Sequence, residues 1–197
     1  MNVKKHLGWI ITGAVVLVLA VWCISGYNGL VSMDEDVAGK WANVETQYQR
    51  RADLIPNLVN TVKGYATHES TTLENVVKAR SEATQIKMTA EDLSPEKLAQ
   101  YQKAQGNVSA AIGRLLMVAE NYPDLKANEN FKDLQSQLEG TENRITVARK
   151  DFNDSAKKYN MAIRRFPKNL IAGIFGFEKK DYFEAESGTE KAPEVKF

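Results

Sequence analysis

The chain is poor in cysteine and histidine, and this scarcity removes two common kinds of site. Of its 197 residues, one is cysteine and two are histidine. Cys23 has no second cysteine to pair with, so an intrachain disulfide and a cysteine metal site are both excluded. His6 and His68 lie on opposite sides of a long apolar stretch, so one soluble domain cannot offer paired imidazoles to zinc. We therefore expect no metal and no cofactor.

Net charge and catalytic motifs are lacking as well. The 26 basic and 25 acidic residues nearly cancel, leaving a formal charge of +1, so no overall field attracts nucleic acid. No phosphate-binding glycine loop, nucleophile elbow or dinucleotide fingerprint is present. His68 and Glu69 begin a metalloprotease pattern, but Thr71 and Thr72 stand where its second histidine is needed. We predict a non-enzymatic protein; an enzyme would require acidic residues inside the fold to hold a metal.

The sequence does contain one long apolar run, from Leu7 to Ile24, and this run carries no charge. At 1.5 Å per residue this run is long enough to cross a hydrocarbon layer about 30 Å thick. A cleaved signal peptide would need small residues at its cleavage site, whereas the bulky Trp22 stands there. We therefore expect a short stub and a retained transmembrane helix within residues 1–26. The aromatic residues that would anchor this span in the two interfaces are Trp9, Trp22 and Tyr27.

The charges on either side of this run predict its orientation. Lys4 and Lys5 precede it, whereas Asp34, Glu35 and Asp36 follow it. Because positive charge favours the cytoplasmic side, the N-terminus should stay inside and the rest of the chain should be extracytoplasmic.

Beyond the span, apolar residues recur with helical spacing. Between residues 30 and 65 they repeat every seven residues on two rows, which predicts a long helix with a coiled-coil-like seam. Pro56 removes a backbone donor inside this helix, so we expect a kink or a local irregularity there. A break near Thr67 leads to a shorter helix, and Ser94 followed by Pro95 is typical of the cap of a third.

The last helix has the strictest period, and short connections make sequential helices antiparallel. We predict an all-α fold in which the N-terminal transmembrane helix is followed by an antiparallel four-helix, coiled-coil-like bundle over residues 27–166. Its seam consists of large side chains at steps of seven, which implies left-handed supercoiling. These seam residues are Phe131, Leu138, Ile145, Phe152, Tyr159 and Phe166.

Several polar residues fall where the seam pattern calls for apolar ones: Arg51, Gln105, Thr141 and Ser155. One interpretation is a buried polar network that fixes the helix register, as single polar core residues do in coiled coils. The alternative is a binding or proton-handling site inside the bundle. The sequence does not choose a counterion for Arg51 among Glu45, Asp53, Glu120 and Glu142.

The predicted helix lengths have a further consequence at the membrane. The first and last helices are much longer than the middle two, so the membrane-proximal half of the long pair should keep an open apolar seam, and such patches are typical of association surfaces. Residues 167–183 follow as a short apolar segment that either touches lipid headgroups or packs across this open end. Residues 184–197 form a polar tail that we expect to be disordered. The apolar residues of the short segment are Leu170, Ile171, Ile174, Phe175 and Phe177.

Several stretches of the chain resemble the LemA family of bacterial membrane proteins. The densest is RRADLIPNLVNTVKGYA at residues 50–66, and others lie at residues 27–31, 134–149 and 159–183. The resemblance implies a membrane-anchored antiparallel helical bundle with no established enzymatic activity, in the bacterial inner membrane.

Two functions are compatible with these predictions. The first is a self-associating scaffold that organises the membrane or neighbouring membrane proteins. The second is an extracytoplasmic adaptor that docks onto a signalling or proteolytic membrane partner. The expected partners are the lipid bilayer, further copies of the chain and other membrane proteins, but not nucleic acid.

Overall fold

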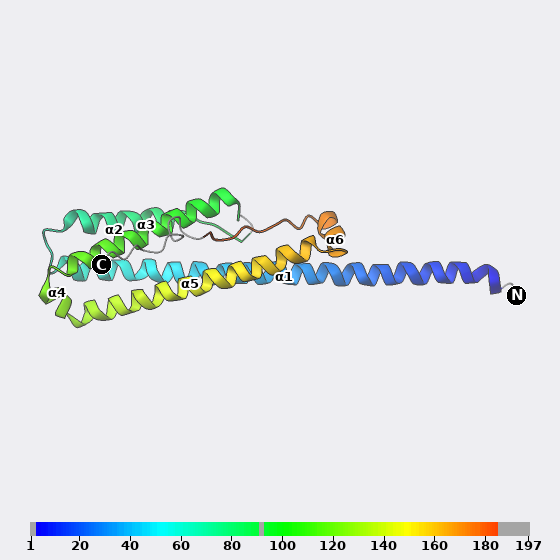
Figure 1. The fold of residues 1–197 in the computed structure, drawn as a ribbon, viewed down its shortest axis with the longest axis horizontal. Helices are drawn as coiled ribbons and strands as arrows, with labels where there is room; N and C mark the ends of the chain where they lie inside the picture. The colour runs from blue at the N-terminus through cyan, green and yellow to red at the C-terminus, as the bar shows by residue number, and fades with distance from the viewer. Residues whose placement is uncertain (1–2, 91–92, 185–197) are drawn as a thin grey trace, which may run out of the picture.

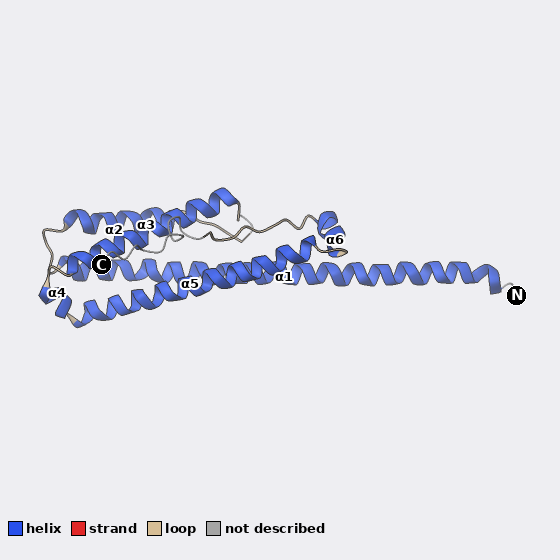
Figure 2. Cartoon of the chain, viewed as in Figure 1, coloured by secondary structure: helices blue, strands red, loops and turns tan. Residues whose placement is uncertain are grey.

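The computed structural model describes residues 3–90 and 93–184, and throughout these ranges the regular structure is α-helical without a strand (Figures 1 and 2). This confirms the predicted all-α class. The helices are α1 (Val3–Lys63), α2 (Ser70–Gln85), α3 (Pro95–Ala119), α4 (Pro123–Ala127), α5 (Glu129–Arg164) and α6 (Lys168–Phe175).

The predicted span and the first bundle helix are one continuous helix. α1 has 61 residues, about 90 Å at 1.5 Å per residue, and it projects beyond the other helices at its N-terminal end (Figure 1). The boundary that the sequence places at residue 26 therefore falls inside a helix, not between two. α1 is long and apolar enough to cross a membrane, judged by length and composition, and none of its apolar window is buried.

The helices form a long pair with a short hairpin on one half of it. α1 and α5 run antiparallel and share the most extensive helix contact, while α2 and α3 form a hairpin that packs on the end of α1 far from its N-terminus (Figure 1). α6 returns to contact α1 and α5. We call the half of the α1–α5 pair that bears the hairpin the distal half, and the half nearer the span the proximal half.

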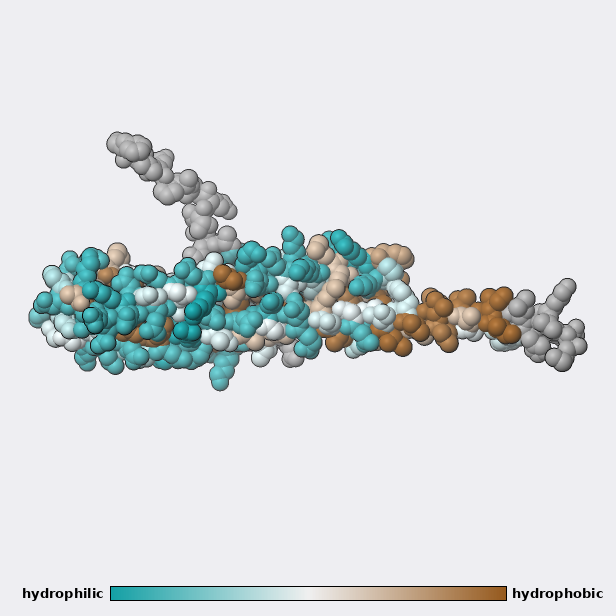
Figure 3. All heavy atoms as spheres, turned by 90° about the horizontal axis from the view of Figure 1, so that it is seen from below, coloured by the Kyte–Doolittle hydropathy of each residue, from teal (hydrophilic) through white to brown (hydrophobic). Residues whose placement is uncertain are grey.

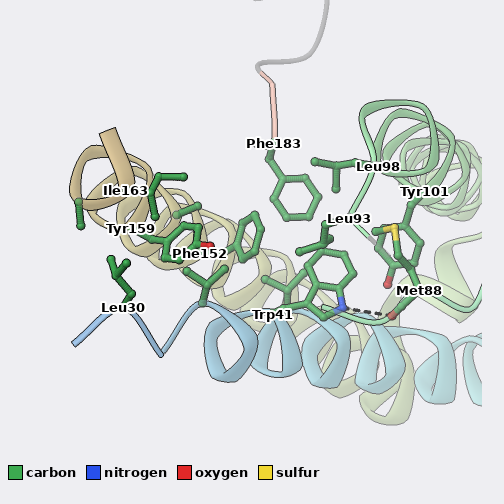
Figure 4. Close-up of a cluster of buried hydrophobic side chains, with 14 of the residues drawn as sticks. Leu30, Trp41, Met88, Leu93, Leu98, Tyr101, Phe152, Tyr159, Ile163 and Phe183 are labelled. Carbon is green, nitrogen blue, oxygen red and sulfur yellow. Dashed lines mark hydrogen bonds between the residues drawn. The ribbon is translucent and has the colours of Figure 1, made fainter. Parts of the chain in front are cut away.

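Each half has its own apolar core. In the distal half, residues of α1 such as Leu58 pack with Val76 of α2, Leu115 of α3 and Leu138 of α5. In the proximal half the core includes several large aromatic residues, and Figure 4 shows them between α1, α3, α5 and the C-terminal segment. The labelled aromatic residues there are Trp41, Tyr101, Phe152, Tyr159 and Phe183.

Most of the predicted seam lies in these cores, but its last member does not. Phe131, Leu138, Ile145, Phe152 and Tyr159 are all buried. Phe166, in contrast, is 80% exposed. The heptad pattern was extended past the end of the helix: α5 ends at Arg164, and the residue before a proline is disfavoured in the α-conformation, so Pro167 turns Phe166 off the helical face.

The helix ends follow local capping rules. The Ser94 hydroxyl accepts a hydrogen bond from the Lys97 amide at 3.4 Å, with Pro95 at the first position of α3. The Asn128 side chain caps α5 in the same way, accepting from the Phe131 amide at 3.0 Å. Pro123 begins the short α4, while α3 ends four residues earlier at Ala119.

The proximal seam is not open, which corrects the expectation from helix lengths. Residues 177–184, which we call the C-terminal strap, run back along the pair after α6 (Figure 1). The Phe183 ring stacks on Trp41 with centroids 5.8 Å apart and meets Phe152 edge-on at 5.5 Å. Met88 and Leu93, from the loop between α2 and α3, complete this cover. Irregular segments of the chain therefore cover the proximal seam where α2 and α3 do not reach.

Candidate functional site

Arg51 joins three helices at the middle of the fold. Its guanidinium, 2% exposed, donates from Nη1 to Ser109 Oγ at 2.6 Å and to Glu142 Oε1 at 2.7 Å. Nη2 donates to the carbonyl of Gln105 at 3.0 Å and to its side-chain Oε1 at 2.6 Å. We call these four residues the Arg51 node. It links α1 to α3 and α5, so a slip of any of these helices would break charge-assisted hydrogen bonds.

The node includes two of the four polar residues that interrupt the predicted seam; of the other two, Ser155 donates instead to Asp36 Oδ2 at 2.6 Å. Arg51 and Gln105 meet directly, but Thr141 is fully buried and donates to the carbonyl of Gln137, in its own helix, at 2.7 Å. Among the four candidate counterions the structure places Glu142 beside Arg51. Both terminal nitrogens of the Arg51 guanidinium already donate to protein acceptors, which is the arrangement that the register interpretation predicts.

Pro56 creates a second polar contact between helices. A helical residue at position 56 would donate its amide to the carbonyl of Ala52, but proline has no amide hydrogen. Arg80 of α2 supplies the missing donor, with Nε 2.7 Å from the Ala52 carbonyl oxygen. α1 continues as a helix through Pro56 to Lys63. The proline therefore presents a backbone acceptor to which α2 docks, a role that the sequence alone does not reveal.

A groove of about 1120 Å³ lies beside these contacts, between α1, α2 and the loop that follows α2. Its polar lining mixes charges of both signs, including Glu45, Arg50, Asp53 and Lys87. Burial raises the pKa of Glu45 above its usual value and does the same for Tyr101, where Tyr48 and Glu45 add to the effect. The surroundings of Tyr101 therefore favour its neutral form.

No metal centre accompanies this groove within residues 8–90 and 93–184, where no group of three or more histidine, cysteine, aspartate or glutamate side chains is arranged to hold an ion. The chemistry that the groove offers is recognition: hydrogen bonding, charge pairing and contact with aromatic rings such as Trp41.

Two asparagines of α5 hold the C-terminal strap. Asn160 donates from Nδ2 to the carbonyl of Lys180 at 2.7 Å and accepts from the Lys180 amide at 2.9 Å. Asn153 makes the same pair of bonds with Phe183, both at 2.9 Å. The two asparagines are seven residues apart, so both lie on one face of α5. In the sequence, this spacing is the one signal that two asparagines of α5 could bind the same segment.

The predicted association segment divides between two environments. Ile171 is buried against α1, Phe177 is half-buried, and Leu170, Ile174 and Phe175 are exposed. The predicted anchors are also exposed to different degrees: Trp9 at 81%, and Trp22 and Tyr27 at 39% and 37%. Tyr27 contacts the rings of Phe175 and Phe177 at 4.8 and 5.7 Å between centroids. The segment thus lies beside the end of the candidate span.

These features define a class: an all-helical protein whose longest helix carries a candidate membrane span and continues into the rest of the fold, where polar contacts join it to the neighbouring helices. The particular family follows from sequence comparison. A model of the LemA family matches residues 40–197, so this chain belongs to the LemA family.

The relatives carry two names. The chain is 30% identical over 196 residues to magnetosome protein MamQ 2 of Paramagnetospirillum magneticum, covering 91% of this chain and 72% of that protein. It is 32% identical over 174 residues to magnetosome protein MamQ of Magnetospirillum gryphiswaldense, covering 80% and 64%. It is 23% identical over 145 residues to protein LemA of Metamycoplasma hominis, covering 74% and 63%. Neither name denotes an enzyme.

Proposed function

We propose that this protein is a non-enzymatic scaffold of the bacterial inner membrane that associates with further copies of itself and thereby organises the membrane or neighbouring membrane proteins. The observation that carries the proposal is the unbroken course of α1 from the candidate span into the distal half of the fold. A span joined to its domain by a flexible linker leaves that domain free to tumble. A continuous helix instead fixes the height and direction of the domain above the bilayer.

Fixed height and direction favour lateral association. Partners that are already oriented lose less rotational freedom when they bind, so weak contacts suffice. Copies anchored in one bilayer would present the same faces at the same level. The magnetosome proteins among the relatives support a role within a larger assembly, since they are named for the structure in which they occur.

The alternative is an extracytoplasmic adaptor, and the groove beside α1 and α2 favours it. Arg50 and Lys87 are exposed in this groove, and the buried aromatic residues Trp41 and Tyr101 also line it. A partner segment with acidic and apolar residues would suit such a lining.

Crosslinking of the full-length protein in intact cells separates the two functions. The scaffold predicts a ladder of homotypic species, and the adaptor predicts a single band that contains another protein. The double variant Arg50→Glu/Lys87→Glu, with Lys157→Glu outside the groove as its control, should leave the ladder unchanged. Loss of one heterologous band in the double variant alone would favour the adaptor, and an absence of homotypic species would refute the scaffold.

The orientation is part of the proposal. With the N-terminus cytoplasmic, the fold beyond the span lies outside the cytoplasmic membrane. Protease added to intact spheroplasts should then digest this part of the protein, whereas protection of it would reverse the topology.

A further inference from the structure

We propose that the outer face of α6 lies in the lipid interface, as a second membrane contact beside the candidate span. Its apolar side chains would enter the boundary between headgroups and acyl chains, and the adjacent basic residues would face the phosphates of anionic phospholipids. This inference does not require self-association, so it stands or falls separately from the scaffold.

The first observation is that α6 keeps an apolar face uncovered. Phe166 is 80% exposed and Ile174 75% exposed, and Leu170 and Phe175 are each more than half exposed. Phe166 lies two residues before the start of α6, and the other three residues belong to the helix. Large apolar side chains gathered on one short segment indicate a contact surface.

The second observation is where the inner face of α6 attaches. Ile171 packs so closely against Gly26 of α1 that a Cβ added at Gly26 would lie 2.3 Å from its Cδ1 atom. Lys168 reaches Gly29, where its Nζ would lie 3.8 Å from an added Cβ. Gly26 follows the end of the strongly apolar run, at Ile24, by two residues. The attachment therefore holds α6 at the level where the span leaves the hydrocarbon layer.

The surface of the molecule shows the two features as one region. In Figure 3 the hydrophobic colour covers the span and reaches the end of the bundle that adjoins it. Tyr27 links them, because it belongs to α1 and contacts the rings of Phe175 and Phe177. An apolar surface that continues from a membrane span has the bilayer as its natural occupant, since insertion of the span already places it there.

Charge supports the same occupant. Arg164 and Arg165 are exposed at the end of α5, directly before the segment, and Lys168 begins α6. A helix with an apolar face and adjacent basic residues is typical of interfacial membrane contacts, and each basic residue near the surface adds attraction to anionic lipids.

A nitroxide placed at position 174 tests the proposal in the full-length protein. The Cys23→Ser background removes the native thiol, and Ile174→Cys carries the label; Leu170→Cys is the second site and Val147→Cys, exposed in the middle of α5, is the control. The protein is reconstituted in vesicles of phosphatidylcholine with or without phosphatidylglycerol. Collision rates with oxygen, which partitions into lipid, and with a water-soluble nickel complex are then compared.

We expect the ratio of oxygen to nickel collisions to be several-fold higher at positions 174 and 170 than at position 147. Equal ratios at all three positions would overturn the proposal. So would spin–spin broadening at position 174 that disappears on dilution with unlabelled protein, because a second copy would then cover the face.

The two lipid compositions test the basic residues. Phosphatidylglycerol should raise the ratio at position 174, and Arg165→Gln/Lys168→Gln should abolish that increase. The control double variant Lys157→Gln/Lys158→Gln, on the exposed surface of α5 away from α6, should leave it unchanged. An identical ratio in both lipid compositions would refute the pairing of these side chains with headgroup phosphates.

Discussion

The apolar faces of the α1–α5 pair are covered by different kinds of segment in its distal and proximal halves. In the distal half two further helices, α2 and α3, cover the apolar faces of the pair. In the proximal half only the first turns of α3 and the short α6 contribute helical residues, and the rest of the cover is the loop before α3 and the C-terminal strap, which have no helical hydrogen bonds of their own. Asn153 and Asn160 satisfy part of the strap's backbone instead. A short chain can therefore complete a long bundle without supplying four long helices.

The difference also concerns stability. Helices keep their backbone hydrogen bonds when they move apart, whereas the strap depends on side chains of α5 for the bonds that hold it. Segments with few backbone bonds of their own open at lower free energy than the core. We therefore expect the proximal cover to be the first part of the soluble fold to open.

The largest effect should come from Phe183→Ala. The substitution removes the ring that packs on Trp41 and Phe152, and loss of a buried phenylalanine costs about 3–5 kcal/mol. Hydrogen exchange should accelerate in the strap and the loop before α3 but not in α2 or at the distal end of α3. Phe166→Ala is the matched control, because that ring is exposed. Equal losses in the free energy of unfolding for both variants would contradict the division into two halves.

Arg51→Met should have the next largest effect, because it leaves the buried Gln105 side chain without its partner at the centre of the fold. We expect a loss of about 2–4 kcal/mol in denaturant unfolding. Arg50→Met, at the exposed neighbouring position, should cost less than about 0.5 kcal/mol. An Arg51→Met protein as stable as the parent would show that the node does not stabilise the junction of the two halves.

The contact between Arg80 and α1 calls for a double-mutant cycle. In the parent protein Arg80→Ala leaves the Ala52 carbonyl without its donor, at a cost of about 1–2 kcal/mol. In Pro56→Ala the new backbone amide can satisfy that carbonyl, so Arg80→Ala should cost less there. A coupling of about 1 kcal/mol from the unfolding of the four proteins is expected, whereas strict additivity would refute the compensation.

The smallest effect concerns Glu45, in the groove between the halves. Burial raises its pKa in the folded protein above the usual 4.5, so the folded state disfavours the charged form. Glu45→Gln should therefore make the protein slightly more stable at pH 7. This advantage should shrink as the pH falls through the raised pKa and vanish below about 4, where Glu45 is protonated in both states.

Local signals in the sequence were sufficient for much of the helical framework. The seven-residue period of α5 and the Ser94–Pro95 start of α3 depend on neighbours within a few residues, and the structure places both as expected. The same pattern failed at Phe166, because periodicity does not mark where a helix ends. The end of the apolar run near residue 26 gave no sign that α1 continues through it as one helix.

The polar contacts needed information that the sequence does not contain. Glu142 lies 91 residues from Arg51, and four acidic residues were equally eligible as its partner. Arg80 bonds to the backbone carbonyl of Ala52, and every residue type carries such a carbonyl, so the identity of residue 52 does not indicate the contact. The strap is irregular and has no period at all, so only the tertiary structure shows that Phe183 lies in the proximal core.

The unbroken length of α1 makes the molecule a lever. From Gly26 to Lys63 the helix extends about 55 Å beyond the span. Membrane helices tilt by about 20° on average, and a change of that size would move the distal tip sideways by about 20 Å. With the candidate span in a bilayer, a local change in thickness that alters its tilt would therefore displace a point far from the membrane surface.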